Sequence, residues 1–166
     1  MTVTHTRIPS PVGELTLVAA DGALTGVYFP EHRHHPGVET FGDRDDAGFD
    51  EAVAQLGEYF AGERRRFELP LAPRGDAFQQ KVWMLLRDIP YGETRNYGQL
   101  ADALGDRNLA RAVGAANGRN PLSIIVPCHR VIGADGNLVG YGGGLDRKRF
   151  LLALEEPAEK MAERLF

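Results

Sequence analysis

The sequence predicts an α+β protein of two parts, a strand-rich part of residues 1–73 followed by a helix-rich part of residues 74–166. Alternating apolar residues and turn signals dominate the first part, whereas the second part shows four helical patterns in quick succession. The stretch LPLAPRG between them is typical of a linker. A length of 166 residues also allows one to two domains.

In the first part, residues 8–29 are predicted to form a β-hairpin or meander, because apolar runs flank the turn-forming pair Asp21-Gly22. Residues 30–48 are rich in Pro, Gly and charge, which predicts a loop. Helical spacing of apolar residues predicts a helix over residues 49–62. The loop carries three histidines: His32, His34 and His35. Without a cysteine or a second ligand pair nearby, we expect these histidines in a solvated loop rather than on a metal.

The second part is predicted to begin with a helix that Asp76 caps and Pro90 ends. A short helix over residues 97–104 follows, and then an Ala-rich helix over residues 109–118 with Asn108 as its cap. Two short helices joined by a tight Gly-containing turn are the outline of a helix-turn-helix, although such pairs also occur in proteins that bind no DNA.

The end of the chain is predicted to contain a short buried strand and a last helix. The strand covers the apolar residues 123–126, and the sequence Pro-Cys-His-Arg follows it at once. Asp146 is placed to cap the helix, which carries Leu151 and Leu154.

The composition is that of an ordinary globular protein, with 43% hydrophobic and 25% charged residues. No run approaches the roughly 18 to 20 apolar residues of a membrane span, and no signal-peptide core is present, so we expect a cytoplasmic protein without a membrane partner. The net charge of −4 alone argues mildly against a nucleic-acid partner. It divides into −6 for residues 1–73 (6 basic, 12 acidic) and +2 for residues 74–166 (13 basic, 11 acidic).

The Ala-rich helix has an unusual set of candidates for its exposed face, in place of the Asn, Gln, Ser and Arg that usually read base edges. These candidates are Ala110, Ala112, Ala115, Ala116 and one long cation, Arg111. Small side chains let a backbone approach another surface closely. The pattern leaves two interpretations open, contact with a partner and tight packing inside the protein.

The chain has one cysteine, Cys128, which excludes an intramolecular disulfide and favours a reducing compartment. A lone cysteine is commonly a small buried hydrophobe. It becomes reactive as a thiolate, which forms beside a cation or a proton acceptor, and His129 and Arg130 are the next two residues. Neighbours in an extended segment point to opposite faces, so a water is expected to bridge Cys128 and His129.

Glu155 is placed on or beside the inward face of the last helix, four residues after Leu151. A buried carboxylate needs a partner, and His129 is the most useful one available. A Glu155–His129–water–Cys128 relay would orient the imidazole and polarise the thiol, whereas the alternative is a carboxylate in solvent at the helix end. A nucleophile some ten residues past a helix-turn-helix points to chemistry on DNA.

The segment NPLSIIVPCHRVIGADGNLVGYGGGLDRKRFLLALE resembles the active-site segment of the O6-alkylguanine-DNA alkyltransferases, or methylated-DNA–protein-cysteine methyltransferases. The resemblance covers residues 78–155 closely, including FQQKVWMLLRDIPYGETRNYGQLA and ARAVGAANGRNP, and SPVGELTLVAADGALTGV more loosely. It implies a ribonuclease-H-like α/β domain over residues 1–73. It also implies a winged helix-turn-helix-type domain over residues 74–166 that carries the active-site cysteine.

The resemblance implies irreversible repair of double-stranded DNA that contains alkylated guanine. The damaged base rotates out of the stack, and Cys128 takes the alkyl group from its O6 atom in one displacement. O4-alkylthymine is implied as a lesser substrate. Each molecule reacts once and needs no cofactor. We expect a monomer in solution and leave cooperative binding along DNA open.

The resemblance also assigns site residues position by position. Cys128 matches the nucleophile, and His129 and Glu155 match the water-mediated relay. Asn120 matches the residue that braces the turn beneath the site, and Tyr97 the one that hydrogen-bonds the flipped base. The residues implied to bind DNA are Arg111, which fills the vacated stack from a helix in the minor groove, and Ala110, Ala112, Gly114, Thr94 and Tyr97. The implied substrate pocket is formed by Tyr97, Val131, Tyr141, Gly142 and Gly143.

Two departures and two alternatives accompany this assignment. Gly142 stands where family members more often carry Ala or Ser, which is expected to loosen the pocket loop. The zinc site that some relatives build in the N-terminal domain is expected to be absent, because no cysteine precedes Cys128. A DNA-binding regulator would read sequence in the major groove, and a Cys-His hydrolase would turn over many times.

Overall fold

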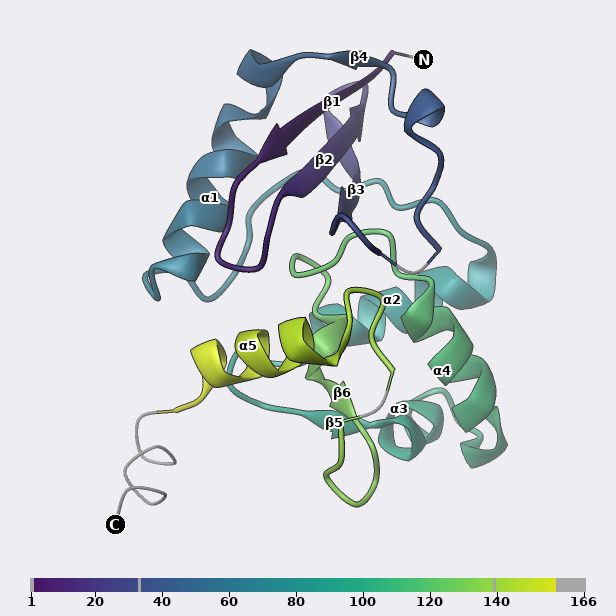
Figure 1. Ribbon diagram of the computed structural model, residues 1–166. Coiled ribbons are helices and arrows are strands. Elements are labelled where there is room, and N and C mark those ends of the chain that lie inside the picture. Colours follow the sequence, from purple (N-terminus) through teal and green to yellow (C-terminus); the bar gives the residue numbers. More distant parts are fainter. Residues whose placement is uncertain (1, 33, 139, 158–166) are drawn as a thin grey trace.

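The computed structural model describes residues 2–32, 34–138 and 140–157. Within these residues a four-stranded sheet with one helix precedes a group of four helices, which lie below the sheet in Figure 1. The predicted α+β class, with the sheet first and the helices second, is therefore confirmed. No helix in the described part is long and apolar enough to cross a membrane.

The N-terminal sheet has the strand order β3-β2-β1-β4. Its strands are β1 (Val3–Ile8), β2 (Leu15–Ala20), β3 (Ala23–Tyr28) and β4 (Asp43–Arg44). The first three form an antiparallel meander, and β4 adds in parallel to β1. Asp21 and Gly22 connect β2 to β3 with φ angles of 51° and 87°. Both residues of a tight type I′ turn need such positive angles, so the predicted turn is confirmed.

Helix α1 (Asp50–Phe60) lies beside the sheet in Figure 1 and confirms the helix expected over residues 49–62. Its inward side chains include Leu56 and Tyr59, which join the same apolar core as Leu15 and Leu17 of β2. The segment predicted as a loop contains two short 3-10 turns, Val38–Thr40 and Asp46–Phe49.

The C-terminal part contains four helices in its described residues: α2 (Ala77–Arg87), α3 (Tyr97–Ala103), α4 (Ala110–Gly118) and α5 (Leu145–Glu155). The short strands β5 (Arg95–Asn96) and β6 (Val131–Ile132) pair in parallel and tie the loop before α3 to the segment after Cys128. Asp76 caps α2 as predicted, because its side chain accepts a hydrogen bond from the Gln79 backbone N–H.

Two predicted caps were wrong. The Asp106 side chain accepts from the Asn108 backbone N–H at 2.9 Å and caps a 3-10 turn, so Asn108 is not the cap of α4. Helix α5 begins two residues earlier than a cap at Asp146 would give, and Asp146 lies inside its first turn. Gly144 takes the cap position because its φ of 91° suits glycine.

The strand predicted over residues 123–126 was also wrong. The backbone N–H of Ile125 bonds to the Ser123 carbonyl, and that of Val126 bonds to the Leu122 carbonyl, both at 2.8 Å. These local bonds form a buried turn, in which Ile124 takes a φ of 73° that is unfavourable for a β-branched residue. Burial explains why the segment is apolar, and periodicity cannot separate a buried turn from a buried strand.

One apolar core runs through both parts and reaches from Leu15 in the sheet to Leu151 in α5. The backbone N–H of Val27 in β3 donates to the Pro121 carbonyl at 2.8 Å, directly before the buried turn. Trp83 of α2 donates its indole N–H to the Ala116 carbonyl of α4 at 2.9 Å. The segment that leads to Cys128 is thus fixed against the sheet on one side and the helices on the other.

Candidate active site

Cys128 lies at the start of the 3-10 turn Cys128–Arg130 and is only 4% exposed. This segment is not extended as predicted, so the argument from opposite faces of a strand does not apply to Cys128 and His129. The preceding turn is held by Asn120, whose Nδ2 donates to the Val126 carbonyl at 2.8 Å. The Oδ1 of Asn120 accepts from the Leu122 backbone N–H at 3.0 Å.

The environment of Cys128 combines burial with groups that favour a thiolate. Burial raises the pKa of the thiol, while a hydrogen bond from Asn120 and the positive charge of Lys148 act to lower it. Lys148 is fully buried, and its Nζ donates to the Val131 carbonyl at 2.6 Å and to the Gly140 carbonyl at 3.4 Å. Burial lowers the pKa of Lys148 to about 8. Cys128 is therefore a thiol at rest with a cation close by.

His129 and Glu155 form a buried pair, with 2.7 Å between His129 Nε2 and Glu155 Oε2. Burial lowers the pKa of His129, although the hydrogen bond and the charge of Glu155 oppose this shift. The imidazole is neutral at physiological pH, and its proton lies on Nε2 because the carboxylate accepts there. The other ring nitrogen, Nδ1, is buried and has no hydrogen-bond partner among the described residues. It is available as a proton acceptor.

Glu155 is held by more groups than the sequence suggested. The Tyr59 hydroxyl donates to its Oε2 at 2.5 Å, and Arg130 donates from Nε to Oε1 at 2.7 Å and from Nη2 to Oε2 at 3.1 Å. Burial alone would raise the pKa of Glu155, but the hydrogen bonds and charges of His129 and Arg130 outweigh it and lower the pKa to about 2. The carboxylate stays charged at every physiological pH.

Sequence reasoning missed Tyr59 and misassigned Arg130. Tyr59 lies 96 positions before Glu155, and its place on the inward face of α1 identified it only as a core residue. Arg130 was considered as a cation for Cys128, yet its guanidinium is committed to Glu155 and to the Ile89 carbonyl, at 2.7 Å from Nη1. The one sequence signal that could have indicated these two partners is that a buried carboxylate needs hydrogen-bond donors.

A pocket of about 340 Å³ brings together several of the expected residues, although Cys128, Val131 and Gly143 are not among those that line it. Those that line it include Tyr97, Gly114, Asn117, Tyr141 and Gly142. Burial raises the pKa of both tyrosines, and the charge of an ionised Cys128 acts in the same direction. A Cβ on Gly114 would lie 3.7 Å from the Tyr97 ring. The Oδ1 of Asn117 is buried without a hydrogen-bond partner among the described residues, as expected where a ligand supplies one.

Helix α4 presents different residues on its two sides. Arg111, Ala112 and Ala115 are exposed, and Ala110 and Gly114 are half-buried. Ala116, predicted among the exposed candidates, is instead 3% exposed and packs in the core. Both interpretations of the Ala-rich sequence therefore apply, each to one side of the helix. Thr94 is exposed in the loop before β5 and does not line the pocket.

The loop 140–144 is backed by the N-terminal part. Gly143 lies against Phe29, and a Cβ there would come within 2.4 Å of its ring. A Cβ on Gly142 would come within 2.6 Å of His32 Nε2. His32 was expected in a solvated loop, but it is 7% exposed, because its ring stacks on Phe29 and its Nδ1 accepts from the Phe29 backbone N–H at 3.3 Å. The described residues contain no group of three metal-ligating side chains.

Comparison with known proteins identifies the family to which this chain belongs. Residues 3–73 match the family model of the ribonuclease-like domain of 6-O-methylguanine DNA methyltransferase, and residues 77–157 match that of its DNA-binding domain. The chain therefore belongs to the 6-O-methylguanine DNA methyltransferase family, and it is a methyltransferase.

Individual relatives are similar over nearly their whole length. The methylated-DNA–protein-cysteine methyltransferase of Mycobacterium tuberculosis is 53% identical over 152 residues, which is 92% of each chain. That of Methanosarcina acetivorans is 49% identical over 146 residues, 88% of this chain and 94% of the relative. A crystal structure of Mycobacterium tuberculosis OGT in complex with DNA superposes with a TM-score of 0.88 at 53% identity, covering 92% of each chain.

The close approach of Gly142 to His32 predicts that substitutions at these two positions have non-additive effects on the free energy of unfolding. Gly142→Ala is expected to lower the free energy of unfolding by about 1–3 kcal/mol, because the buried, hydrogen-bonded His32 ring cannot move aside freely. In a His32→Ala background the same substitution is expected to cost much less. Urea unfolding of the four proteins measures this coupling. Gly118→Ala, where a Cβ meets nothing within 4 Å, is the control. Equal losses in both backgrounds would contradict the contact.

The lowered pKa of Glu155 predicts a pH dependence of stability. Its folded-state value of about 2 lies below the ordinary 4.5, so its contribution is fully present above about pH 4.5 and is lost as the pH falls toward 2. The difference in unfolding free energy between wild type and Glu155→Gln should therefore shrink as the pH falls through this window. Urea unfolding at a series of pH values measures it, with the exposed Glu63→Gln as control. A difference that stays constant with pH would refute this assignment.

Proposed function

We propose that this protein repairs DNA by moving the alkyl group of O6-alkylguanine in duplex DNA onto Cys128, once per protein molecule. The observation that carries the proposal is the buried Glu155–His129 pair next to the chain's single cysteine, with one imidazole nitrogen left to accept a proton. In the reaction the sulfur forms a bond to the alkyl carbon, and the bond from that carbon to O6 breaks. The electron pair of this bond stays on the base. The thiol proton leaves through His129, and the restored guanine takes up a proton.

The proton path follows from the hydrogen bonds of the pair. Nε2 of His129 is engaged by Glu155, so Nδ1 is the atom that can receive the Cys128 proton, and we propose that a bridging water carries it. Glu155 is ionised and stabilises the imidazolium as it forms. Tyr59 and Arg130 hold the carboxylate in the orientation that fixes the imidazole.

The groups around the sulfur support formation of the thiolate. Lys148 and Asn120 both act against the burial that otherwise keeps Cys128 protonated. Because Lys148 also binds the Val131 carbonyl, its charge is fixed in place beside the site rather than moving with solvent. A buried thiol that ionises only when the proton acceptor is aligned is protected from unrelated electrophiles.

Base flipping is proposed because Cys128 is too deeply buried to reach a base inside a duplex. The pocket of about 340 Å³ that Tyr97 and Tyr141 line offers two tyrosine rings and the unpaired Asn117 Oδ1 to a flipped base. We assign the base contacts to Tyr97, Tyr141 and the loop of Gly142 and Gly143. O4-alkylthymine presents the same alkyl–oxygen bond on a smaller ring, which supports a lesser reaction with it.

Duplex binding is proposed to use the exposed side of α4 in the minor groove. Ala112 and Ala115 are small enough for the helix to approach the narrow groove, and Arg111 is long enough to occupy the space that the flipped base leaves. Thr94 and the half-buried Ala110 and Gly114 are proposed to contact the backbone nearby. The DNA complex of the 53% identical relative supports DNA as the partner. Ala112 and Ala115 carry no polar group that could read a base edge, which fits binding without sequence preference.

Incubation with a duplex oligonucleotide containing O6-methylguanine tests the reaction. One methyl group per protein is expected on Cys128, located by peptide mass spectrometry, because the thioether has no easy route to hydrolysis. Cys128→Ser is expected to carry no methyl group. Product in excess of protein would instead indicate a hydrolase, and binding without any adduct would indicate a regulator.

The role of Arg111 predicts a difference between duplex and free substrate. Arg111→Ala is expected to slow methyl transfer from duplex DNA at least about tenfold, because nothing then fills the vacated stack. Reaction with a free O6-alkylguanine base, which needs no flipping, should keep its rate. Single-turnover rates with both substrates measure this, with Arg7→Ala on the exposed edge of β1 as control. Equal slowing of both reactions would remove Arg111 from flipping.

A further inference from the structure

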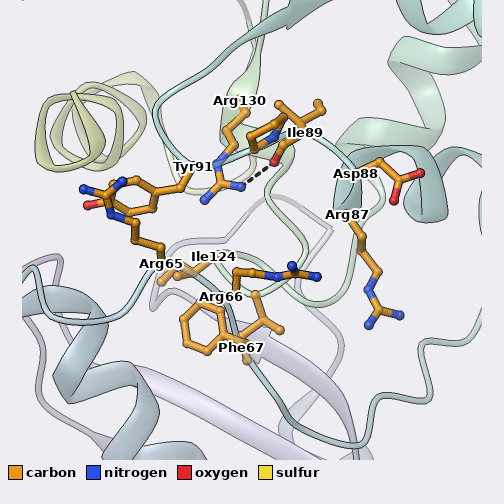
Figure 2. A pocket seen from close by; sticks show the side chains of 11 residues that line it. Arg65, Arg66, Phe67, Arg87, Asp88, Ile89, Tyr91, Ile124 and Arg130 are labelled. Atoms are coloured by element: carbon orange, nitrogen blue, oxygen red, sulfur yellow. Dashed lines mark hydrogen bonds between the residues drawn. The ribbon is translucent and has the colours of Figure 1, made fainter. Parts of the chain in front are cut away.

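A second pocket, of about 450 Å³, lies between the two parts of the chain and is unrelated to the substrate pocket in its lining residues. One wall comes from the segment after α1, with Arg65, Arg66 and Phe67, and another from the end of α2. The buried turn that leads to Cys128 contributes a further wall through Ile124. Figure 2 shows arginine side chains arranged around this space on several sides.

The charge of this pocket is strongly positive. Arg65, Arg66, Arg87 and Arg130 line it, against a single carboxylate, Asp88. Arg130 is neutralised by Glu155, and Arg65 lies over the Tyr91 ring at 5.2 Å from its centroid. Arg66 and Arg87 are exposed, and their guanidinium groups have no ion pair or hydrogen bond with another described residue. In Figure 2 both extend into the same region of the pocket.

Some exposed arginines of the described residues have carboxylate partners, whereas others, such as Arg7 and Arg119, have none, as is the case for Arg66 and Arg87. Arg44, Arg107 and Arg149 each pair with an aspartate at 2.9 Å or less. Arg64, next to the pocket arginines in sequence, pairs with Glu58 at 3.3 Å and does not line the pocket. Arg66 and Arg87 thus leave two planar donor groups open to one space, which suits bidentate binding of an anion.

The rest of the lining is apolar and aromatic. The half-buried Phe67 ring gives the pocket an accessible apolar area next to the positive rim, whereas Ile89 and Ile124 are almost fully buried. Its volume falls in the range of small-ligand sites. A simple inorganic anion would use the rim and leave the apolar area uncovered. A phosphate ester that carries a flat ring satisfies both.

We propose that this pocket binds a nucleotide, with its phosphate between Arg66 and Arg87 and its base against the half-buried Phe67 ring. The phosphate ester can come from a free nucleotide or from the 5′-phosphorylated end of a nucleic-acid strand. Arg130, which also lines this pocket, binds the Glu155 carboxylate that orients His129.

Isothermal titration calorimetry with GMP tests the proposal. Saturable binding with a Kd below about 1 mM is expected, with guanosine and inorganic phosphate each binding more weakly because each supplies only half of the ligand. The double variant Arg66→Gln/Arg87→Gln is expected to bind GMP at least about tenfold more weakly, while Arg64→Gln stays within about twofold of wild type. Absence of GMP binding, or equal binding by the double variant, would overturn the proposal.

A second titration separates the two sources of the phosphate ester. A 5′-phosphorylated hexathymidylate and its unphosphorylated form are compared in wild type and in the double variant. Tighter binding of the phosphorylated strand that depends on Arg66 and Arg87 supports the site and assigns it to strand ends. Binding of GMP alone supports it and assigns it to free nucleotides. Methyl transfer to Cys128 is measured in parallel and should be retained by the double variant, which shows that it is folded.

Discussion

The rest of the site depends on the hydrogen bonds that the Glu155 carboxylate accepts. The carboxylate receives hydrogen bonds from Tyr59 of α1, from His129 and from Arg130, and Arg130 in turn binds the Ile89 carbonyl after α2. A single buried charge thereby joins the N-terminal helix, the cysteine turn and two C-terminal helices. Removing one partner from such a buried network leaves charge without compensation, which typically costs about 3–5 kcal/mol. The network is therefore structural and chemical at once, because the same bonds that satisfy the carboxylate fix the orientation of His129.

The N-terminal part has a direct role in shaping the proposed substrate pocket. Its sheet contributes Phe29 just after β3, and His32 stacks on that ring. Together they fill the space that side chains at Gly142 and Gly143 would occupy. Gly142, where the resemblance implies that Ala or Ser is more common, thus lies against a histidine from the other part of the chain. The pocket loop is held by a close backbone approach to these rings, so the missing methyl group does not by itself mean a looser loop.

Local signals predicted much of the fold. The Asp21-Gly22 turn, the cap at Asp76 and the apolar spacing of α1 each depend on residues close in sequence, and each was confirmed. Strand β1 was not predicted, because its residues are mostly polar and its alternation appears only when it pairs with β2. The turn around Ile124 was mistaken for a strand, because burial and strand formation select the same apolar residues.

The sequence by itself determined the order of sheet and helices, the identity of the single cysteine and the motif that relates the chain to its family. It also indicated His129 and Glu155 as partners, because a buried carboxylate requires a donor. Only the tertiary structure showed that Tyr59 and Arg130 complete this network, that His32 lies against Gly142, and that Arg66 and Arg87 share one pocket. These contacts join residues from separate elements, and no short-range pattern specifies which distant side chains the common core brings together.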